Sequence, residues 1–165
     1  MRRLFVIAAL LGALGTTAAA LAAGNPPITE KILGAGSISD GYTIHVNKPG
    51  DVVVAKATVP PGASFGWHSH RAAVAVVVKS GTLTLYDSAD KSCTPQRYSA
   101  GQGFVEHRNH VHLARNEGNK RVVVLVTYLG LKHGVNPDVP AARPGNCPEK
   151  TNLLRIISSY SGLTS

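Results

Sequence analysis

Charge is scarce in this sequence. Only 16% of its 165 residues are charged, whereas soluble domains usually carry about a quarter. The chain has no internal repeat and no long run of like charge, and its basic residues are scattered without interleaved aromatic residues. These absences argue against a second domain and against a nucleic-acid-binding protein. The net charge of +8 leaves affinity for an anionic cell surface open.

A long apolar run occurs only at the start of the chain. Residues 1–3 are positively charged, residues 4–14 are apolar, and residues 18–23 are mostly small. This pattern is typical of a cleaved secretory signal over residues 1–23, so we expect a secreted, periplasmic or cell-envelope protein without a membrane span after cleavage. An uncleaved anchor is the alternative, but the apolar core is short for a span. Arg2 and Arg3 weakly resemble a twin-arginine signal.

Cysteine is also rare, because the chain has only Cys93 and Cys147. An even number of cysteines in an exported protein predicts a disulfide, here one that ties the tail to the fold. The alternative is that one of them is a metal ligand or a nucleophile. Both cysteines lie in polar turns without an activating base, which favours the disulfide.

Glycine and proline are plentiful, at 17 and 10 residues. They separate short apolar runs spaced about ten residues apart, a habit of all-β sandwiches and barrels. The predicted strands are residues 42–46, 51–59, 64–70, 73–79, 82–86, 102–106, 111–115 and 121–129. Eight strands suffice for a jelly-roll barrel, which we expect to span residues 24–148.

The C-terminal part has a different composition. Residues 133–148 are rich in Pro, Gly and Asn, which predicts an irregular segment held by the disulfide. Residues 149–165 form the expected tail, in which residues 152–157 could be a short helix or an added strand.

Histidines provide the strongest functional signal. His68 and His70 stand two residues apart in a predicted strand, so both imidazoles point to the same face about 7 Å apart. His112 lies in a second predicted strand long enough to pair beside the first. Three neutral histidines suit Fe, Mn, Zn, Ni or Cu, so we predict a divalent-metal site formed by His68, His70 and His112.

This histidine pattern resembles the cupin family over about residues 50–130. The first cupin motif is matched by Gly62, by His68 and His70, and by Gly81, and the spacing of His112 and Asn116 matches the second. The Pro-x-Gly that usually precedes the second-motif histidine is replaced by residues 107–109. The resemblance implies a cupin jelly roll, a double-stranded β-helix, with a metal inside it.

One residue departs from the cupin pattern. Val74 stands where the family has a glutamate ligand, so the resemblance implies a three-histidine site. A dication on neutral ligands would favour an anionic substrate or hydroxide, and some cupins with such sites are dioxygenases. We therefore expect Val74 to line the site as an apolar wall.

Other candidates near the motif carry weaker signals. His110 and Glu106 could each supply a fourth ligand, but side chains beside a turn are usually solvated or hydrogen-bonded. His45, His107 and His133 lack a partner at metal-binding spacing. Trp67 alternates away from His68 and is expected to pack outside the pocket. Tyr86, Tyr98 and Tyr128 are ordinary strand residues unless one faces the metal as an acid or base.

Two functions fit these observations. The first is a secreted metalloenzyme that acts on a small molecule, with oxygen as a candidate co-substrate. The second is a secreted cupin that binds a small ligand or metal without turnover, since fold does not decide function. A homodimer is a further expectation for either function.

Overall fold

The computed structural model describes residues 30–46 and 49–148. The chain divides into two units, residues 1–31 and residues 32–165, and every described strand belongs to the second unit. The expected signal segment, residues 1–23, and the expected tail, residues 149–165, lie outside the described residues. The same holds for the undecided stretch 152–157.

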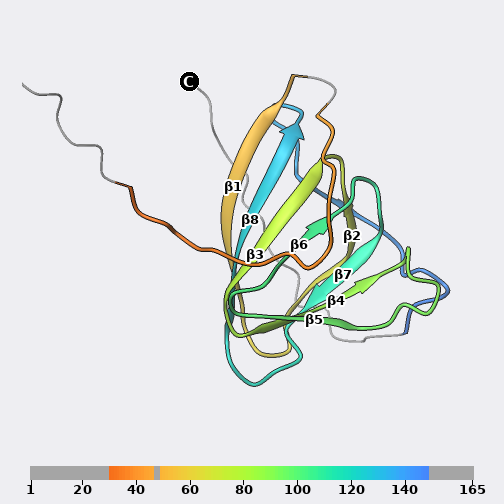
Figure 1. Ribbon diagram of the computed structural model, residues 1–165. Coiled ribbons are helices and arrows are strands. Elements are labelled where there is room, and N and C mark those ends of the chain that lie inside the picture. Colours follow the sequence, from red (N-terminus) through yellow and green to blue (C-terminus); the bar gives the residue numbers. More distant parts are fainter. Residues whose placement is uncertain (1–29, 47–48, 149–165) are drawn as a thin grey trace, which may run out of the picture. The chain divides into compact units, whose positions relative to one another are not determined.

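Nine strands make up the described part of the second unit (Figure 1). They are β1 (Asp51–Val59), β2 (Ser64–His70), β3 (Ala73–Ser80), β4 (Thr82–Asp87), β5 (Gln96–Ser99), β6 (Gly103–Glu106), β7 (His112–Arg115), β8 (Val122–Leu131) and β9 (Asp138–Pro140).

These strands form two antiparallel sheets. One sheet has the order β1-β8-β3-β6, and the other has the order β5-β4-β7-β2-β9. Most strands that follow one another in sequence, such as β2 and β3, lie in different sheets, as in a jelly roll, whereas β4 and β5 pair within one sheet. The all-β prediction is confirmed.

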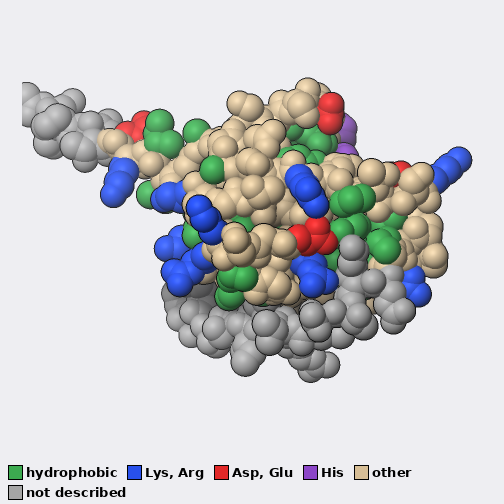
Figure 2. Space-filling model, turned by 90° about the horizontal axis from the view of Figure 1, so that it is seen from below, with side chains coloured by type: hydrophobic (Ala, Val, Ile, Leu, Met, Phe, Trp, Pro, Cys, Tyr) green, Lys and Arg blue, Asp and Glu red, His purple; other side chains and the backbone are tan. Residues whose placement is uncertain are grey.

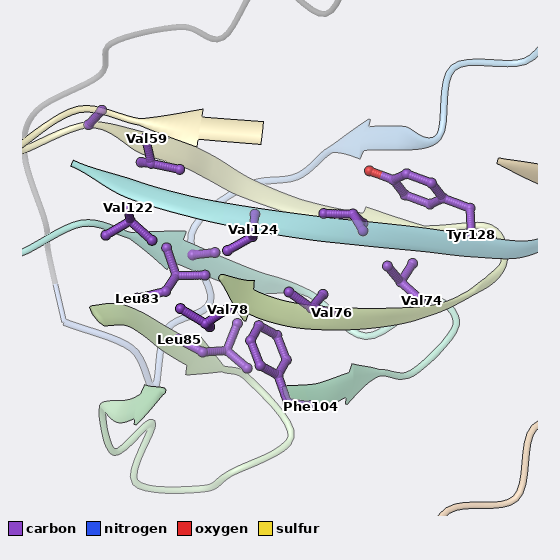
Figure 3. Packing of buried hydrophobic residues seen from close by; sticks show 13 residues of the cluster. Val59, Val74, Val76, Val78, Leu83, Leu85, Phe104, Val122, Val124 and Tyr128 are labelled. Carbon is purple, nitrogen blue, oxygen red and sulfur yellow. The ribbon is translucent and has the colours of Figure 1, made fainter. Parts of the chain in front are cut away.

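The core lies between the two sheets (Figure 3). β3 alternates strictly, so that Val74, Val76 and Val78 are buried while their neighbours are more exposed. Leu83 and Leu85 of β4 meet them from the other sheet. Figure 3 places Val74 and Tyr128 at one end of this core and Leu83 and Val122 at the other. Burial of these side chains is the main force that holds the sheets together.

A glycine makes the tight connection from β3 to β4. Gly81 has φ +78°, and a Cβ at this position would lie 2.9 Å from the carbonyl oxygen of Arg121. Only glycine combines a positive φ with such a close approach of backbone to backbone. The motif position Gly81 therefore serves the turn and has no contact with the site.

Three differences separate the observed strands from the predicted ones. Residues 42–46 are not a strand, because most of them are exposed and no ladder pairs them in the described part of the chain. β5 was not predicted, because only Tyr98 of its four residues faces the core and the segment therefore has no apolar alternation. β9 was not predicted, because its segment is rich in Pro and Asn and it becomes a strand only by pairing with β2. The rest of residues 133–148 is irregular, as predicted.

The predicted disulfide between Cys93 and Cys147 is present, with the two Cα atoms 5.1 Å apart. It is buried with Tyr86, Leu113 and Trp67 in a second apolar cluster. Trp67 thus packs outside the main core, as its alternation with His68 predicts. The disulfide links the β4–β5 connection to the segment that follows β9.

The surface carries the scattered charge expected from the sequence. Figure 2 shows Lys and Arg side chains spread over the visible face, with acidic and apolar side chains between them. Within the described residues, no helix has the length and apolar character needed to cross a membrane.

Candidate metal centre

Three histidines converge at one end of the core. His68 and His70 lie on the same face of β2, and His112 of β7 pairs directly with His68 in the antiparallel register. All three are buried, and one ligand nitrogen from each lies within 4.8 Å of the others. The sequence spacing correctly predicted that they meet. That they bind a metal stays a prediction.

The backbone determines which nitrogen of each ring faces the centre. Nδ1 of His68 donates to the Gly66 carbonyl at 2.9 Å, and Nδ1 of His112 donates to the His110 carbonyl at 3.0 Å. Nδ1 of His70 donates to the Pro137 carbonyl at 3.1 Å. A carbonyl oxygen can only accept, so each Nδ1 carries a hydrogen. Nε2 is thus the nitrogen that each ring can offer to an ion.

Local strand geometry places the Gly66 carbonyl beside His68. Gly66 has φ +73°, and the register between β2 and β7 shifts between Ser64 and Trp67. A glycine with positive φ inside a strand is a mark of a bulge, which redirects the backbone and the residues that follow. This irregularity lets the carbonyl reach forward to the imidazole two residues later.

Glu106, which the sequence predicts to be solvated or hydrogen-bonded, lies buried beside the three histidines. Its side chain is only 7% exposed, and its Oε2 lies 3.1 Å from Nε2 of His70. Its Oε1 lies 3.3 Å from Nε2 of His112. Glu106 on β6 pairs with Val74 on β3, so a carboxylate stands on the strand next to the position where the cupin motif has its glutamate. Strand pairing was the missing signal, and the sequence alone does not reveal it.

Val74 is fully buried in the core but is not among the residues that line the cavity beside the histidines, so its role as an apolar wall at the metal stays a prediction. His110 is exposed and contributes only its backbone carbonyl, so it is not a fourth ligand. Asn116 is buried away from the site, where its side chain donates to the carbonyls of Val59 and Lys120. The second-motif asparagine therefore holds the loop after β7.

Two residues at the site carried no specific signal in the sequence. Asp138 of β9 places Oδ1 3.3 Å from Nδ1 of His70. Tyr128 of β8 donates its hydroxyl to the same carboxylate at 3.5 Å, and its ring packs edge-on against His70. Both side chains reach the site from neighbouring strands that are distant in sequence. Tyr128 is the tyrosine that faces the candidate centre.

The titration behaviour of the site follows from this packing. Burial alone would lower the pKa of His70, but hydrogen bonds to Asp138 and Glu106 raise it to about 10. Burial, with repulsion by His112 and His70, lowers the pKa of His68 to about 4. Burial also lowers the pKa of His112. At neutral pH one imidazolium, His70, therefore stands between two carboxylates.

The same packing shifts the pKa values of the two carboxylates and of Tyr128. Burial alone would raise the pKa of Glu106, but His112 and His70 lower it below its usual value. The same competition, with His70 as the partner, lowers the pKa of Asp138. Burial and the nearby carboxylates raise the pKa of Tyr128, which keeps its phenol protonated. Without a metal, the group has a net charge of about −1 at neutral pH.

A small cavity of about 20 Å³ adjoins the histidines, which is space for one or two water molecules. Its polar end is formed by His68, His70, Glu106, Tyr128 and Asp138. The remaining wall is apolar, made by Phe65, Val76, Leu83, Phe104, Ala114, Val124 and Val126. No lysine or arginine lines it.

Sequence comparison agrees with this arrangement. Residues 55–128 match the sequence model of the cupin domain. This part of the chain therefore resembles a cupin domain. No curated protein matches the sequence at a significant level.

The chain is also similar, at low sequence identity, to several solved structures. A DMSP lyase from Ruegeria pomeroyi is 18% identical with a TM-score of 0.47, over 54% of this chain and 42% of that protein. A predicted oxalate decarboxylase from Thermotoga maritima is 22% identical with a TM-score of 0.42, over 48% and 66%. The cupin domain of Schizosaccharomyces pombe Cnp3 is 13% identical with a TM-score of 0.44, over 53% and 59%. This chain spans less than two thirds of the length of each of the three.

Proposed function

We propose that this protein binds one divalent metal ion through Nε2 of His68, His70 and His112, with Glu106 as a fourth ligand. The observation that carries the proposal is the convergence of the three imidazoles, each with its Nδ1 occupied by a carbonyl. Histidines held by a partner on the far nitrogen are the usual arrangement in metal sites.

The donor atoms fit such an ion. Nε2 of His112 is buried and has no hydrogen-bond partner among the described residues. A buried polar atom without a partner is costly, and an ion would satisfy it. Imidazole and carboxylate donors together suit Mn, Fe, Zn, Ni and Cu, so the donor set leaves the identity of the metal open.

Glu106 changes the substrate that we expect. Three neutral imidazoles would leave the charge of a dication uncompensated and favour an anion. With the carboxylates of Glu106 and Asp138 next to it, a dication would leave the site close to neutral. The cavity has no basic residue for a further anionic group. We infer a small ligand with little or no charge, of a few heavy atoms.

We propose a metalloenzyme that acts on such a molecule, with oxygen as a co-substrate. The bound ion would supply Lewis acidity and open coordination positions. The protonated phenol of Tyr128 stands at the polar end of the cavity, where it can donate a hydrogen bond to a ligand. The apolar wall would keep bulk water out. Residues 1–23 would direct the protein to the cell envelope or outside the cell.

A cupin that binds metal without turnover is the second candidate. The observation in its favour is the size of the cavity, about 20 Å³, which holds no more than one or two waters. An enzyme would require a substrate small enough for this cavity.

Metal analysis of protein purified from its exporting host tests the proposal. We expect about one equivalent of a transition metal in the wild type, its loss in His112→Gln, and no change in His110→Gln, which alters an exposed histidine nearby. Oxygen uptake with a panel of small neutral metabolites then separates the enzyme from the binder. A wild-type protein that contains no transition metal and binds none when supplied would refute the metal site.

A further inference from the structure

β9 contributes to the site from the edge of its sheet. It pairs with the outer edge of β2, with Asp138 directly opposite His70 and Pro140 opposite His68. This pairing brings the Pro137 carbonyl and the Asp138 carboxylate to Nδ1 of His70, at 3.1 and 3.3 Å. The contact joins residues 67 positions apart in the sequence.

His70 depends on this contact more than its two partners depend on theirs. His68 and His112 are each oriented by the carbonyl two residues earlier in their own chain segment. These local bonds form as soon as the segment adopts its backbone conformation. His70 has no such local partner for Nδ1, whose contacts come from Pro137 and Asp138 at the start of β9.

Asp138 is itself held in place. Its backbone N–H donates to the side-chain oxygen of Asn136 at 2.9 Å, and its carboxylate accepts a hydrogen bond from the hydroxyl of Tyr128. Its side chain is 28% exposed, so it lies at the rim of the site. The segment after β9 is anchored by the Ala141 N–H, which donates to the Trp67 carbonyl, and by the disulfide at Cys147.

We propose that Asp138 is a positioning residue: delivered by β9, its carboxylate shares Nδ1–H of His70 with the Pro137 carbonyl and holds the ring so that Nε2 faces the metal. This inference rests on the proposed metal site. A carboxylate on the far nitrogen fixes the ring and makes the ligating nitrogen more basic, and its loss usually weakens metal binding about 10–100-fold.

Zn²⁺ titration by calorimetry on the full chain provides the first test. We expect Asp138→Ala to weaken Zn²⁺ binding about 10–100-fold, and Asp138→Asn, which keeps an oxygen acceptor, to recover part of the loss. The matched control is Asp51→Ala, which removes a carboxylate 3.0 Å from Nδ1 of the exposed His133 and should leave binding unchanged. Urea unfolding of each variant confirms that the protein titrated is folded.

The second test needs no metal. Long-range ¹H–¹⁵N NMR of the metal-free protein should detect a solvent-protected Nδ1–H on His70 in the wild type and in Asp51→Ala. In Asp138→Ala we expect this signal to exchange rapidly or disappear. A purely structural role for Asp138 would leave it intact, because the Pro137 carbonyl would still accept it.

The two tests separate the inference from the metal site on which it rests. Wild-type Zn²⁺ affinity in both Asp138 variants, or a protected Nδ1–H of His70 in Asp138→Ala, would overturn the positioning role. A wild type that binds no Zn²⁺ would overturn the proposed function instead, and the NMR result would then decide for or against the positioning of His70 by Asp138.

Discussion

At the scale of the residue, the central feature is a carboxylate that reaches the site from an unexpected strand. Val74 and Glu106 face each other across β3 and β6, and both are buried. Cross-strand neighbours on one face lie about 5 Å apart, so a side chain on either strand can reach the same point. The chain therefore has the same donor types as the cupin motif, with the carboxylate moved sideways by one strand.

Exchanging this pair tests the assignment. Glu106→Val should weaken divalent-metal binding about tenfold or more, because it removes a ligand and a negative charge. Val74→Glu alone should bring no gain, since Glu106 already occupies the position. The double variant Val74→Glu with Glu106→Val should recover part of the affinity lost by Glu106→Val. Calorimetric metal titration measures all three.

A different outcome of these titrations would contradict the assignment of Glu106 as a ligand. Tighter metal binding by Val74→Glu, together with unchanged binding by Glu106→Val, would restore the three-histidine site that the sequence implies. His110→Ala serves as a control in the same titration, because its side chain is exposed.

At the scale of the element, the segment that contains β9 has few contacts of its own. β9 is three residues long and pairs only with β2 among the described strands. The disulfide encloses 54 positions of sequence, from Cys93 to Cys147, and thus limits how far this segment can move away. Asn146 adds hydrogen bonds to the carbonyls of Ser88 and Asp90 in the same region.

Removal of the disulfide should therefore destabilise the fold. For a loop of this length we expect the double variant Cys93→Ala, Cys147→Ala to lose about 4 kcal/mol of unfolding free energy. We also expect weaker metal binding, because β9 orients His70. Urea denaturation with and without reductant measures the first effect. An equal midpoint for oxidised and reduced wild type would contradict it.

At the scale of the whole molecule, the buried charges make stability depend on pH. The pKa of His70 is raised to about 10 in the folded, metal-free protein. Its stabilising contribution is complete below its unfolded value of about 6.5 and is lost as the pH rises towards 10. Glu106 and Asp138 have lowered pKa values, so their contributions are present at neutral pH and are lost in acid.

The remaining histidines act in the same direction in acid. His68 and His112 have lowered pKa values, so below about pH 6.5 these histidines bind protons in the unfolded chain but not in the folded protein. This difference lowers the free energy of unfolding in acid. We therefore expect the metal-free protein to be most stable near pH 6 to 7 and to lose on the order of a few kcal/mol towards pH 10. Urea unfolding of chelator-treated protein across pH 4 to 10 measures this curve.

A matched variant identifies the group responsible. His70→Gln should flatten the alkaline side of the curve, whereas His133→Gln, which alters an exposed histidine, should not. An alkaline side that is unchanged in His70→Gln would assign the dependence to other groups.

Local patterns in the sequence sufficed for much of this protein. Alternation of apolar residues located seven of the nine strands, because side chains in a strand alternate between core and solvent. The spacing of His68, His70 and His112 predicted their convergence, and the two cysteines together with the expected export predicted the disulfide. The strands and the histidine site follow from the spacing of residues along the chain. The disulfide follows because two cysteines allow only one pairing.

Tertiary structure alone decided which other groups join the histidines. Glu106 reaches them because β6 pairs with β3, Tyr128 because β8 pairs with β3, and Asp138 because β9 pairs with β2. The sequence offered Glu106 and Tyr128 only as weak candidates and gave no signal for Asp138. Strand register depends on the packing of the entire core, and a shift of one residue would turn each of them away from the site. For this reason the sequence predicted the histidines of the site but not its two carboxylates.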